Sequence, residues 1–190
     1  MFSEALTFLI NIVFSLLGVA LLLRAWAYTA RLHPFNPVSQ TIFKVTDWLV
    51  QPLHKLVKNA KFLDWPSLLA AYLAALVYTI LVFMIQGGAA HLDIFISLLP
   101  QLLMLALVYL LRWSLSLILW IVLAQAILSW VNPGAPFMPL LRILTEPLLA
   151  PVRRFMPNLG ALDLSPLIII ILTQLGSIIL NNVSRNLIGL

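Results

Sequence analysis

The chain of 190 residues is 63% hydrophobic and only 9% charged, its mean hydropathy is +1.07 and its net charge is +5. A soluble domain could not cover its surface with so few polar residues, and several apolar runs reach the roughly 20 residues that cross a bilayer. The runs do not alternate, which excludes a porin-type barrel and predicts an all-α membrane protein. The lack of cysteine excludes disulfides and thiolate metal sites.

Four membrane spans are predicted in chain order, at 5–30, 66–86, about 101–131 and 165–184. The first run is longer than the apolar core of a signal peptide and has no basic leader, so we expect it to be retained. Residues 87–100 are expected to form an outer, partly interfacial connection. One straight helix over 92–131 would instead reach about 60 Å, twice the hydrocarbon thickness.

The basic residues gather in two segments, and no Lys or Arg occurs between Lys61 and Arg112. Cytoplasmic loops of membrane proteins are enriched in Lys and Arg, which explains the positive charge without a nucleic-acid partner and places both segments in the cytoplasm. An even number of spans must then separate them, so both termini are expected outside the cytoplasm. The main alternative has five spans with a turn at Arg112, which would place the two segments on opposite sides.

The two halves of the chain resemble each other. The matching motifs are QPL at 51–53 with EPL at 146–148, NP at 36–37 with NP at 132–133, and DWPS at 64–67 with DLSP at 163–166. These matches predict two parallel repeats, 1–86 and 101–190, joined by 87–100, each with the order span, basic segment, span.

Each basic segment is predicted to contain an amphipathic helix, because apolar residues recur at steps of three or four. The apolar positions are Val38, Ile42, Val45, Leu49, Leu53, Leu56 and Ala60 in the first segment, and Phe137, Leu141, Leu144, Leu148, Val152 and Phe155 in the second. Pro52 and Pro147 are expected to break or kink these helices. Such helices could lie on the anionic leaflet or pack beneath the spans as a structural floor.

The motifs NP…EPLLAPVRRFMP…DLSP over 132–166, and LLRAW at 22–26 followed by NP…QPLHKLV, resemble the YggT (YlmG-like) family of integral membrane proteins. The resemblance covers almost the whole chain. It implies a small protein of two helical repeats in the bacterial inner membrane, with no established enzyme activity. It also implies links to osmotic-stress tolerance, to cell division and nucleoid organisation and, in plastid relatives, to assembly of a membrane cytochrome. The chain departs from the pattern at Gln125, which stands where the first copy has Arg24, and at Leu149-Ala150, where many relatives carry an arginine.

No catalytic, cofactor or metal site is predicted. The six acidic residues form no metal-ligand or acid–base motif, and no phosphate-binding glycine loop occurs. His33, His54 and His91 lie far apart and outside the spans, which argues against a haem site.

Four polar residues are predicted within the membrane: Asn11, Arg112, Gln174 and Asn181. Arg112 adjoins aromatic residues, so an outer aromatic-basic belt is favoured over a functional charge. Gln174 and Asn181 share one face of the last span, which suits helix packing or a homo-oligomer better than a solute path.

Two local contacts are also expected near the second basic segment. Asp163 or Ser165 can cap the last span, with Pro166 in its first turn. Glu146 can pair with Arg142, four residues earlier on the same helical face.

The leading functional hypothesis is a non-enzymatic scaffold or assembly factor of the inner membrane. Its contact surface for anionic lipid or a protein partner would consist of Lys55, Lys58, Arg142, Arg153 and Arg154. The alternative is a small channel or transporter component for ion or osmolyte balance, with a path lined by Asn11, Arg112, Gln174 and Asn181.

Overall fold

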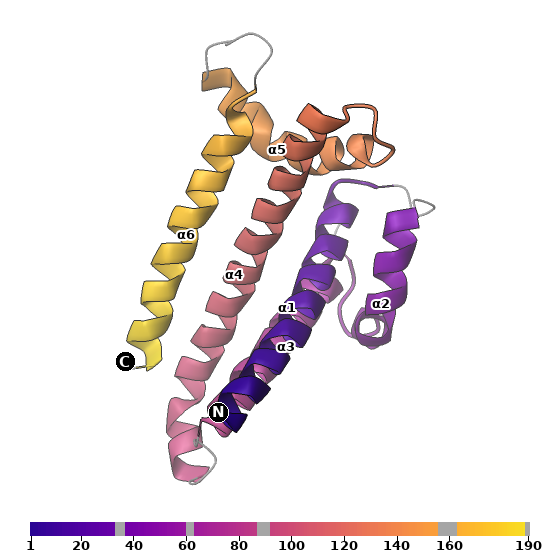
Figure 1. Cartoon of the computed structure of the whole chain (residues 1–190). Helices are drawn as coiled ribbons and strands as arrows, with labels where there is room; N and C mark the ends of the chain where they lie inside the picture. Colours follow the sequence, from indigo (N-terminus) through magenta and orange to yellow (C-terminus); the bar gives the residue numbers. More distant parts are fainter. Residues whose placement is uncertain (33–36, 60–62, 87–91, 156–162, 189–190) are drawn as a thin grey trace. The chain divides into compact units, whose positions relative to one another are not determined.

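The computed structural model describes residues 1–32, 37–59, 63–86, 92–155 and 163–188, and within these ranges every regular element is a helix (Figure 1). The helices are α1 (Phe2–Thr29), α2 (Pro37–His54), α3 (Trp65–Ile85), α4 (Leu92–Val131), α5 (Met138–Phe155) and α6 (Ser165–Ile188). Among them α1, α3, α4 and α6 are long and apolar enough to cross a membrane. The prediction of an all-α membrane protein with four spans is therefore confirmed.

Helix α4 is longer than the sequence predicted. Residues 92–100 were expected in a connecting segment but form the first turns of α4, and 87–91 lie outside the described residues. The helix continues without interruption through Pro100 and Arg112, which rules out the five-span arrangement. Its most apolar part, Ser97–Val131, would extend about 52 Å, so α4 must tilt or project beyond a hydrocarbon layer of roughly 30 Å.

The amphipathic helices also continue through prolines. Pro52 lies two residues before the end of α2, and Pro147 and Pro151 lie inside α5. Each stays a single helix, so the expected break into two pieces is not found.

The buried face of α2 differs from the predicted apolar stripe. Among the residues of α2 whose burial is described, 39–54, the buried ones are Ser39, Thr46 and Val50, whereas Val45 is about half exposed at 51%. Part of the apolar stripe therefore faces outward, as in a helix that presents apolar side chains to lipid or to a partner.

The starts of α3 and α6 are fixed by acidic side chains. Asp64 caps α3 by accepting a hydrogen bond from the Ser67 backbone N–H, and Pro66 occupies the first turn. At α6, Asp163 accepts a hydrogen bond from the Ser165 backbone N–H at 2.9 Å, as the sequence predicted. These acceptors satisfy N–H groups that lack partners within the first helical turn.

The helices form two compact units, one of Met1–Ser114 with Leu180–Leu190 and one of Leu115–Ile179. In the first unit, Gly18 of α1 allows close approach of the Trp113 ring, which lies 6.0 Å from the ring of Tyr78. In the second unit, Val122, Leu149 and Ile169 bring α4, α5 and α6 together in a buried core.

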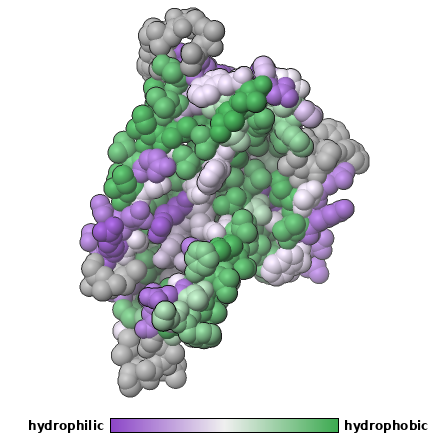
Figure 2. Space-filling model, in the orientation of Figure 1, coloured by the Kyte–Doolittle hydropathy of each residue, from purple (hydrophilic) through white to green (hydrophobic). Residues whose placement is uncertain are grey.

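Much of the outer surface of the spans is apolar. Only 17% of the most apolar window of α1 and of α6 is buried inside the protein. Large apolar side chains such as Leu16, Leu172 and Ile179 are more than half exposed, and apolar residues cover much of the face drawn in Figure 2. In a membrane protein such a surface is covered by lipid rather than by the fold itself.

The contact between Gly18 and Trp113 gives the first prediction. A methyl group at Gly18 would overlap the indole ring of Trp113, which is only 5% exposed and cannot move aside freely. We expect Gly18→Ala to lower the free energy of unfolding by about 1–3 kcal/mol, the usual cost of overpacking. Thermal denaturation in mild detergent measures the effect. Gly134→Ala is the control because a methyl group there would make only an ordinary contact, 3.7 Å from Asn132 Oδ1, and equal melting temperatures for both variants would contradict the prediction.

Candidate functional site

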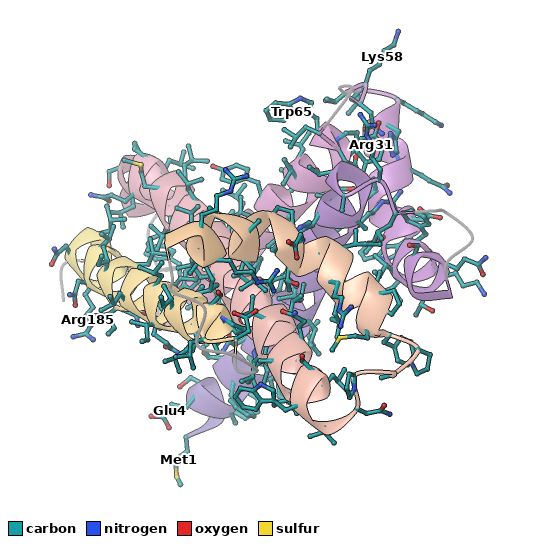
Figure 3. All side chains as sticks on the ribbon, turned by 90° about the horizontal axis from the view of Figure 1, so that it is seen from above. Met1, Glu4, Arg31, Lys58, Trp65 and Arg185 are labelled. Carbon is teal, nitrogen blue, oxygen red and sulfur yellow. The ribbon has the colours of Figure 1, made fainter. Side chains whose placement is uncertain are left out.

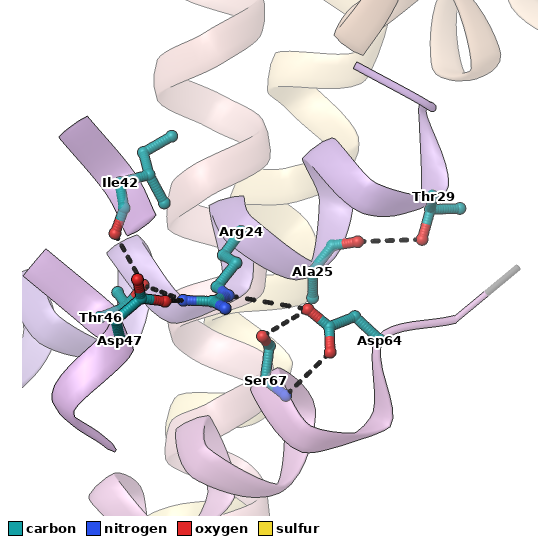
Figure 4. Close-up of polar contacts among 8 residues, drawn as sticks. All are labelled: Arg24, Ala25, Thr29, Ile42, Thr46, Asp47, Asp64 and Ser67. Carbon is teal, nitrogen blue, oxygen red and sulfur yellow. Dashed lines mark hydrogen bonds and ion pairs between the residues drawn. The ribbon is translucent and has the colours of Figure 1, made fainter. Parts of the chain in front are cut away.

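A buried arginine joins three helices of the first unit. Arg24 of α1 is only 7% exposed, and its Nη1 donates hydrogen bonds to Asp47 Oδ1 at 2.6 Å and Thr46 Oγ1 at 2.9 Å (Figure 4). Its Nε lies 3.8 Å from Oδ2 of Asp64. One guanidinium thus faces carboxylates from α2 and from the start of α3, which compensates a charge that would be costly alone inside an apolar bundle.

Asp64 has a double role in this cluster. Its side chain, 4% exposed, also accepts a hydrogen bond from Ser67 Oγ at 2.5 Å while it caps α3. The ring of Phe43 lies 4.8 Å from Cζ of Arg24 and adds a cation–π contact. The Arg24 Nε is buried without a hydrogen-bond partner, so ion pairing rather than complete hydrogen bonding satisfies this side of the guanidinium.

The second unit contains a related but more open cluster. Arg153 of α5 lies between two carboxylates, with Nη1 2.9 Å from Glu146 Oε2 and Nη2 2.9 Å from Asp163 Oδ2. Its Nε donates to the same Asp163 oxygen at 3.0 Å. These bonds connect α5 to the start of α6, and all three side chains are at least one-third exposed. Solvent therefore weakens each ion pair relative to the buried cluster of Arg24.

The pairing changes the proton affinity of both partners. Partial burial favours the neutral form of Asp163, but hydrogen bonds from Ser165 and Arg153 outweigh it, so the pKa of Asp163 is lowered from 3.8. Partial burial likewise disfavours the charge on Arg153, but its bonds to Glu146 and Asp163 raise the pKa of its guanidinium overall.

A cavity of about 330 Å³ adjoins this cluster within the second unit. It is lined by Gln125 and Ser129 of α4, by Arg142, Glu146 and Arg153 of α5, and by Asp163. Gln125 is 6% exposed, and its Oε1 is buried without a hydrogen-bond partner. Among the described residues Arg142 forms no ion pair, because Glu146 pairs with Arg153 and not, as expected, with Arg142.

The predicted contact residues fall into two groups. Lys55, Lys58, Arg142 and Arg154 are exposed. Arg153, in contrast, holds α5 to the start of α6 through its ion pairs, a role that the sequence analysis did not assign to it.

The surroundings of the predicted in-membrane polar residues differ. Asn11 is exposed and borders a cavity of about 380 Å³ in the first unit, and the Arg112 guanidinium lies 5.5 Å from the Tyr109 ring, as expected of an aromatic-basic belt. Gln174 is exposed and Asn181 is half-buried.

The structure adds no metal site in the part of the chain that it describes. Within that part, no three His, Asp or Glu side chains gather where they could hold a metal ion. His54 is the last residue of α2 and is half-buried, whereas His33 and His91 lie outside the described residues.

Sequence reasoning missed the Arg24 cluster. The available signal was a charged residue inside an apolar run, which requires a partner in the membrane, together with the acids that precede the later spans. The pairing of Arg24 with Asp47 and Asp64 depends on how three helices pack, which the sequence alone does not show.

The fold and its clusters define the chain as an all-α membrane protein in which ion pairs tie amphipathic helices to membrane spans. A family model described as CCB3/YggT matches residues 3–85 and 104–184. The chain belongs to this family, which confirms the resemblance seen in its motifs.

Bacterial relatives match over nearly their whole length. The chain is 36% identical over 170 residues to a protein of Escherichia coli strain K12 described as "Uncharacterized protein YggT", covering 89% of this chain and 85% of the relative. It is 33% identical over 182 residues to a protein of Vibrio alginolyticus, with 95% of each covered, and 32% identical over 185 residues to a protein of Pseudomonas aeruginosa, with 96% and 91% covered. No solved structure matches the chain.

The buried ion pairs of Arg24 predict a large loss of stability in Arg24→Gln. The variant leaves Asp64 buried without a cation, which we expect to lower the free energy of unfolding by about 3–5 kcal/mol. Thermal denaturation in mild detergent tests this, with the exposed Arg185→Gln as control. The double variant Arg24→Gln/Asp64→Asn should recover part of the loss because it removes the unpaired charge. An unchanged melting temperature for Arg24→Gln would contradict the ion-pair interpretation.

The lowered pKa of Asp163 predicts a pH dependence. Because its pKa is lower in the folded protein than its ordinary value of 3.8, the stabilisation is complete above that value and is lost as pH falls through the folded pKa. The difference in stability between the wild type and Asp163→Asn should therefore shrink on acidification. Melting temperatures of the two proteins between neutral pH and pH 3 would measure it, and a difference that does not change with pH would refute the assignment.

Proposed function

We propose that this protein is a non-enzymatic scaffold or assembly factor of the bacterial inner membrane. The observation that supports the proposal most directly is the pair of amphipathic helices, α2 and α5, which carry exposed cations and exposed apolar side chains at the same time. Such helices suit contact with a protein partner at the surface of an anionic leaflet.

The exposed side chains around α2 illustrate this combination. Trp48 is 65% exposed and Leu56 is 79% exposed, and Lys55 and Lys58 lie close by in the chain. Figure 3 shows Lys58 extending away from the ribbon. Large aromatic and apolar side chains provide contact area, while the lysines favour anionic groups.

The cations that we propose to contact a partner are Lys55 and Lys58 in the first unit and Arg142 and Arg154 in the second. Arg153 is left out because its guanidinium already pairs with Glu146 and Asp163. It would position α5, and with it the neighbouring Arg154.

We further propose that the two halves of the chain, 1–86 and 101–190, are copies of one ancestral repeat. Buried residues recur 99 positions apart: Ser39 with Met138, Thr46 with Thr145, Val50 with Leu149, and Ala74 with Thr173. In the first span of each copy the interval is 101, for Leu21 with Val122, Arg24 with Gln125, and Ala25 with Ala126. The two stretches matched by the family model support the same interpretation. This register aligns Pro52 with Pro151 rather than with Pro147.

The copies would have the same orientation. With α2 and α5 on the cytoplasmic side and four spans in total, both termini would lie outside the cytoplasm. Osmotic-stress tolerance and cell division are the processes that we propose from the family resemblance, and an assembly factor could act in either without a catalytic centre.

In-cell photocrosslinking tests the scaffold function. A photoreactive residue in place of Arg154 should give a discrete protein adduct, because Arg154 is an exposed cation at the end of α5. The adduct should weaken at least severalfold when Lys55, Lys58 and Arg142 are replaced by Gln, since electrostatic attraction to the partner is reduced.

The control carries the photoreactive residue at Asn186, which is exposed near the end of α6 and lies outside the proposed surface. Crosslinks from position 154 only to lipid or to a second copy of the chain would argue against a scaffold.

A further inference from the structure

We propose that the cavity of the second unit binds the ammonium end of an ethanolamine phosphate group. The source would be the headgroup of phosphatidylethanolamine or a soluble ethanolamine phosphate. This site is distinct in kind from the exposed basic surface, because it is a defined cavity with charges of both signs.

The first support is an unsatisfied polar group. Oε1 of Gln125 is buried and has no hydrogen-bond partner, although a buried amide oxygen without a donor is costly. One donor group of the cavity wall, the Arg153 guanidinium, already serves Glu146 and Asp163. Gln125 lines the cavity, so a turn of its amide would present the oxygen to a ligand that carries N–H donors, and Ser129, one turn later on the same face of α4, offers a hydroxyl.

The second support is the charge of the cavity wall. Arg142 and Arg153 balance Glu146 and Asp163, so a simple anion or a simple cation would add an uncompensated charge. A zwitterion brings one charge of each sign and therefore leaves the charge of the cavity balanced. Arg142, which has no ion pair among the described residues, can meet the phosphate, while the carboxylate of Glu146 and the oxygen of Gln125 can meet the ammonium.

The third support comes from the equivalent place in the first unit. There the position of Gln125 is held by Arg24, whose own guanidinium reaches Asp47 and Asp64. The second unit keeps two acids, Glu146 and Asp163, but its span contributes an uncharged amide. A cationic group supplied from outside would thus occupy space that an arginine side chain fills in the first unit.

The size of the cavity also fits. Its volume of about 330 Å³ corresponds to roughly ten water molecules, far more than one bridging water requires. Gln125 lies six residues before the end of α4, about 9 Å along the helix axis from that end.

Native mass spectrometry of the full-length protein in detergent tests the proposal. The protein is mixed with equal amounts of phosphatidylethanolamine and phosphatidylcholine that have identical acyl chains. We expect occupancy by phosphatidylethanolamine to be roughly three- to tenfold higher, because the choline ammonium has no N–H group for Gln125. Successive N-methylation of the ethanolamine lipid should lower the occupancy stepwise. Equal occupancy by all of these lipids would overturn the proposal without any variant.

Variants at Gln125 locate the site. Gln125→Arg should fill the cavity as Arg24 does in the first unit, and Gln125→Leu removes the acceptor, so both should bring the ratio of the two lipids close to one. Gln101→Arg and Gln101→Leu are matched controls at an exposed glutamine on the same helix and should keep the preference. A preference that survives both Gln125 variants would overturn the assignment to this cavity.

Soluble ethanolamine phosphate distinguishes the two sources. If it displaces the lipid from the wild type, the site recognises the group on its own, and if the lipid remains, the site belongs to the membrane headgroup. The lipid ratio does not depend on a protein partner, and Lys55→Gln/Lys58→Gln, which leaves the cavity intact, should not change it. Failure of the scaffold proposal and failure of this one would therefore be seen in different experiments.

Discussion

The buried guanidinium of Arg24 is the interaction on which the first unit depends. A charge at that depth is tolerated only when carboxylates compensate it, and these come from Asp47 on α2 and Asp64 at the start of α3. Asp64 can compensate the charge of Arg24 only if α3 begins at Trp65, because the same carboxylate caps that helix. One side chain, Arg24 of α1, therefore couples the position of α2 to the start of α3.

The second unit meets the same requirement in a different way. Its cation, Arg153, belongs to the amphipathic helix rather than to the span, and it meets Glu146 and Asp163 nearer to solvent. The desolvation cost is smaller there, and so is the stabilisation that each ion pair provides. The span of the second unit carries the uncharged Gln125 beside a cavity, whereas the span of the first unit carries Arg24 in a closed cluster.

Much of this architecture could be predicted from the sequence because membrane spans are selected by length and hydropathy alone. The starts of the spans near Trp65 and Ser165 were predicted to within a residue, since Asp and Pro mark the starts of both helices. The predicted beginning of α4 was wrong, because residues 87–100, which end at Pro100, were expected to form a connection. In the structure the helix continues through that proline, and neighbouring helices in a membrane can compensate the lost hydrogen bond.

The charged clusters could not be predicted in the same way, because they depend on tertiary contacts. The motif around Arg153 and Arg154 suggests two equivalent surface cations, yet a rotation of about 100° between neighbouring helical positions turns one toward Asp163 and leaves the other exposed. The sequence shows that Gln125 stands where the first of the two similar segments has Arg24, but it does not show what surrounds either residue. The structure places Arg24 on α1 between two carboxylates, whereas in the second unit the cation between two carboxylates is Arg153 on α5 and the Gln125 oxygen has no hydrogen-bond partner. The difference between the two similar segments therefore becomes interpretable only when the acids that face each position are known.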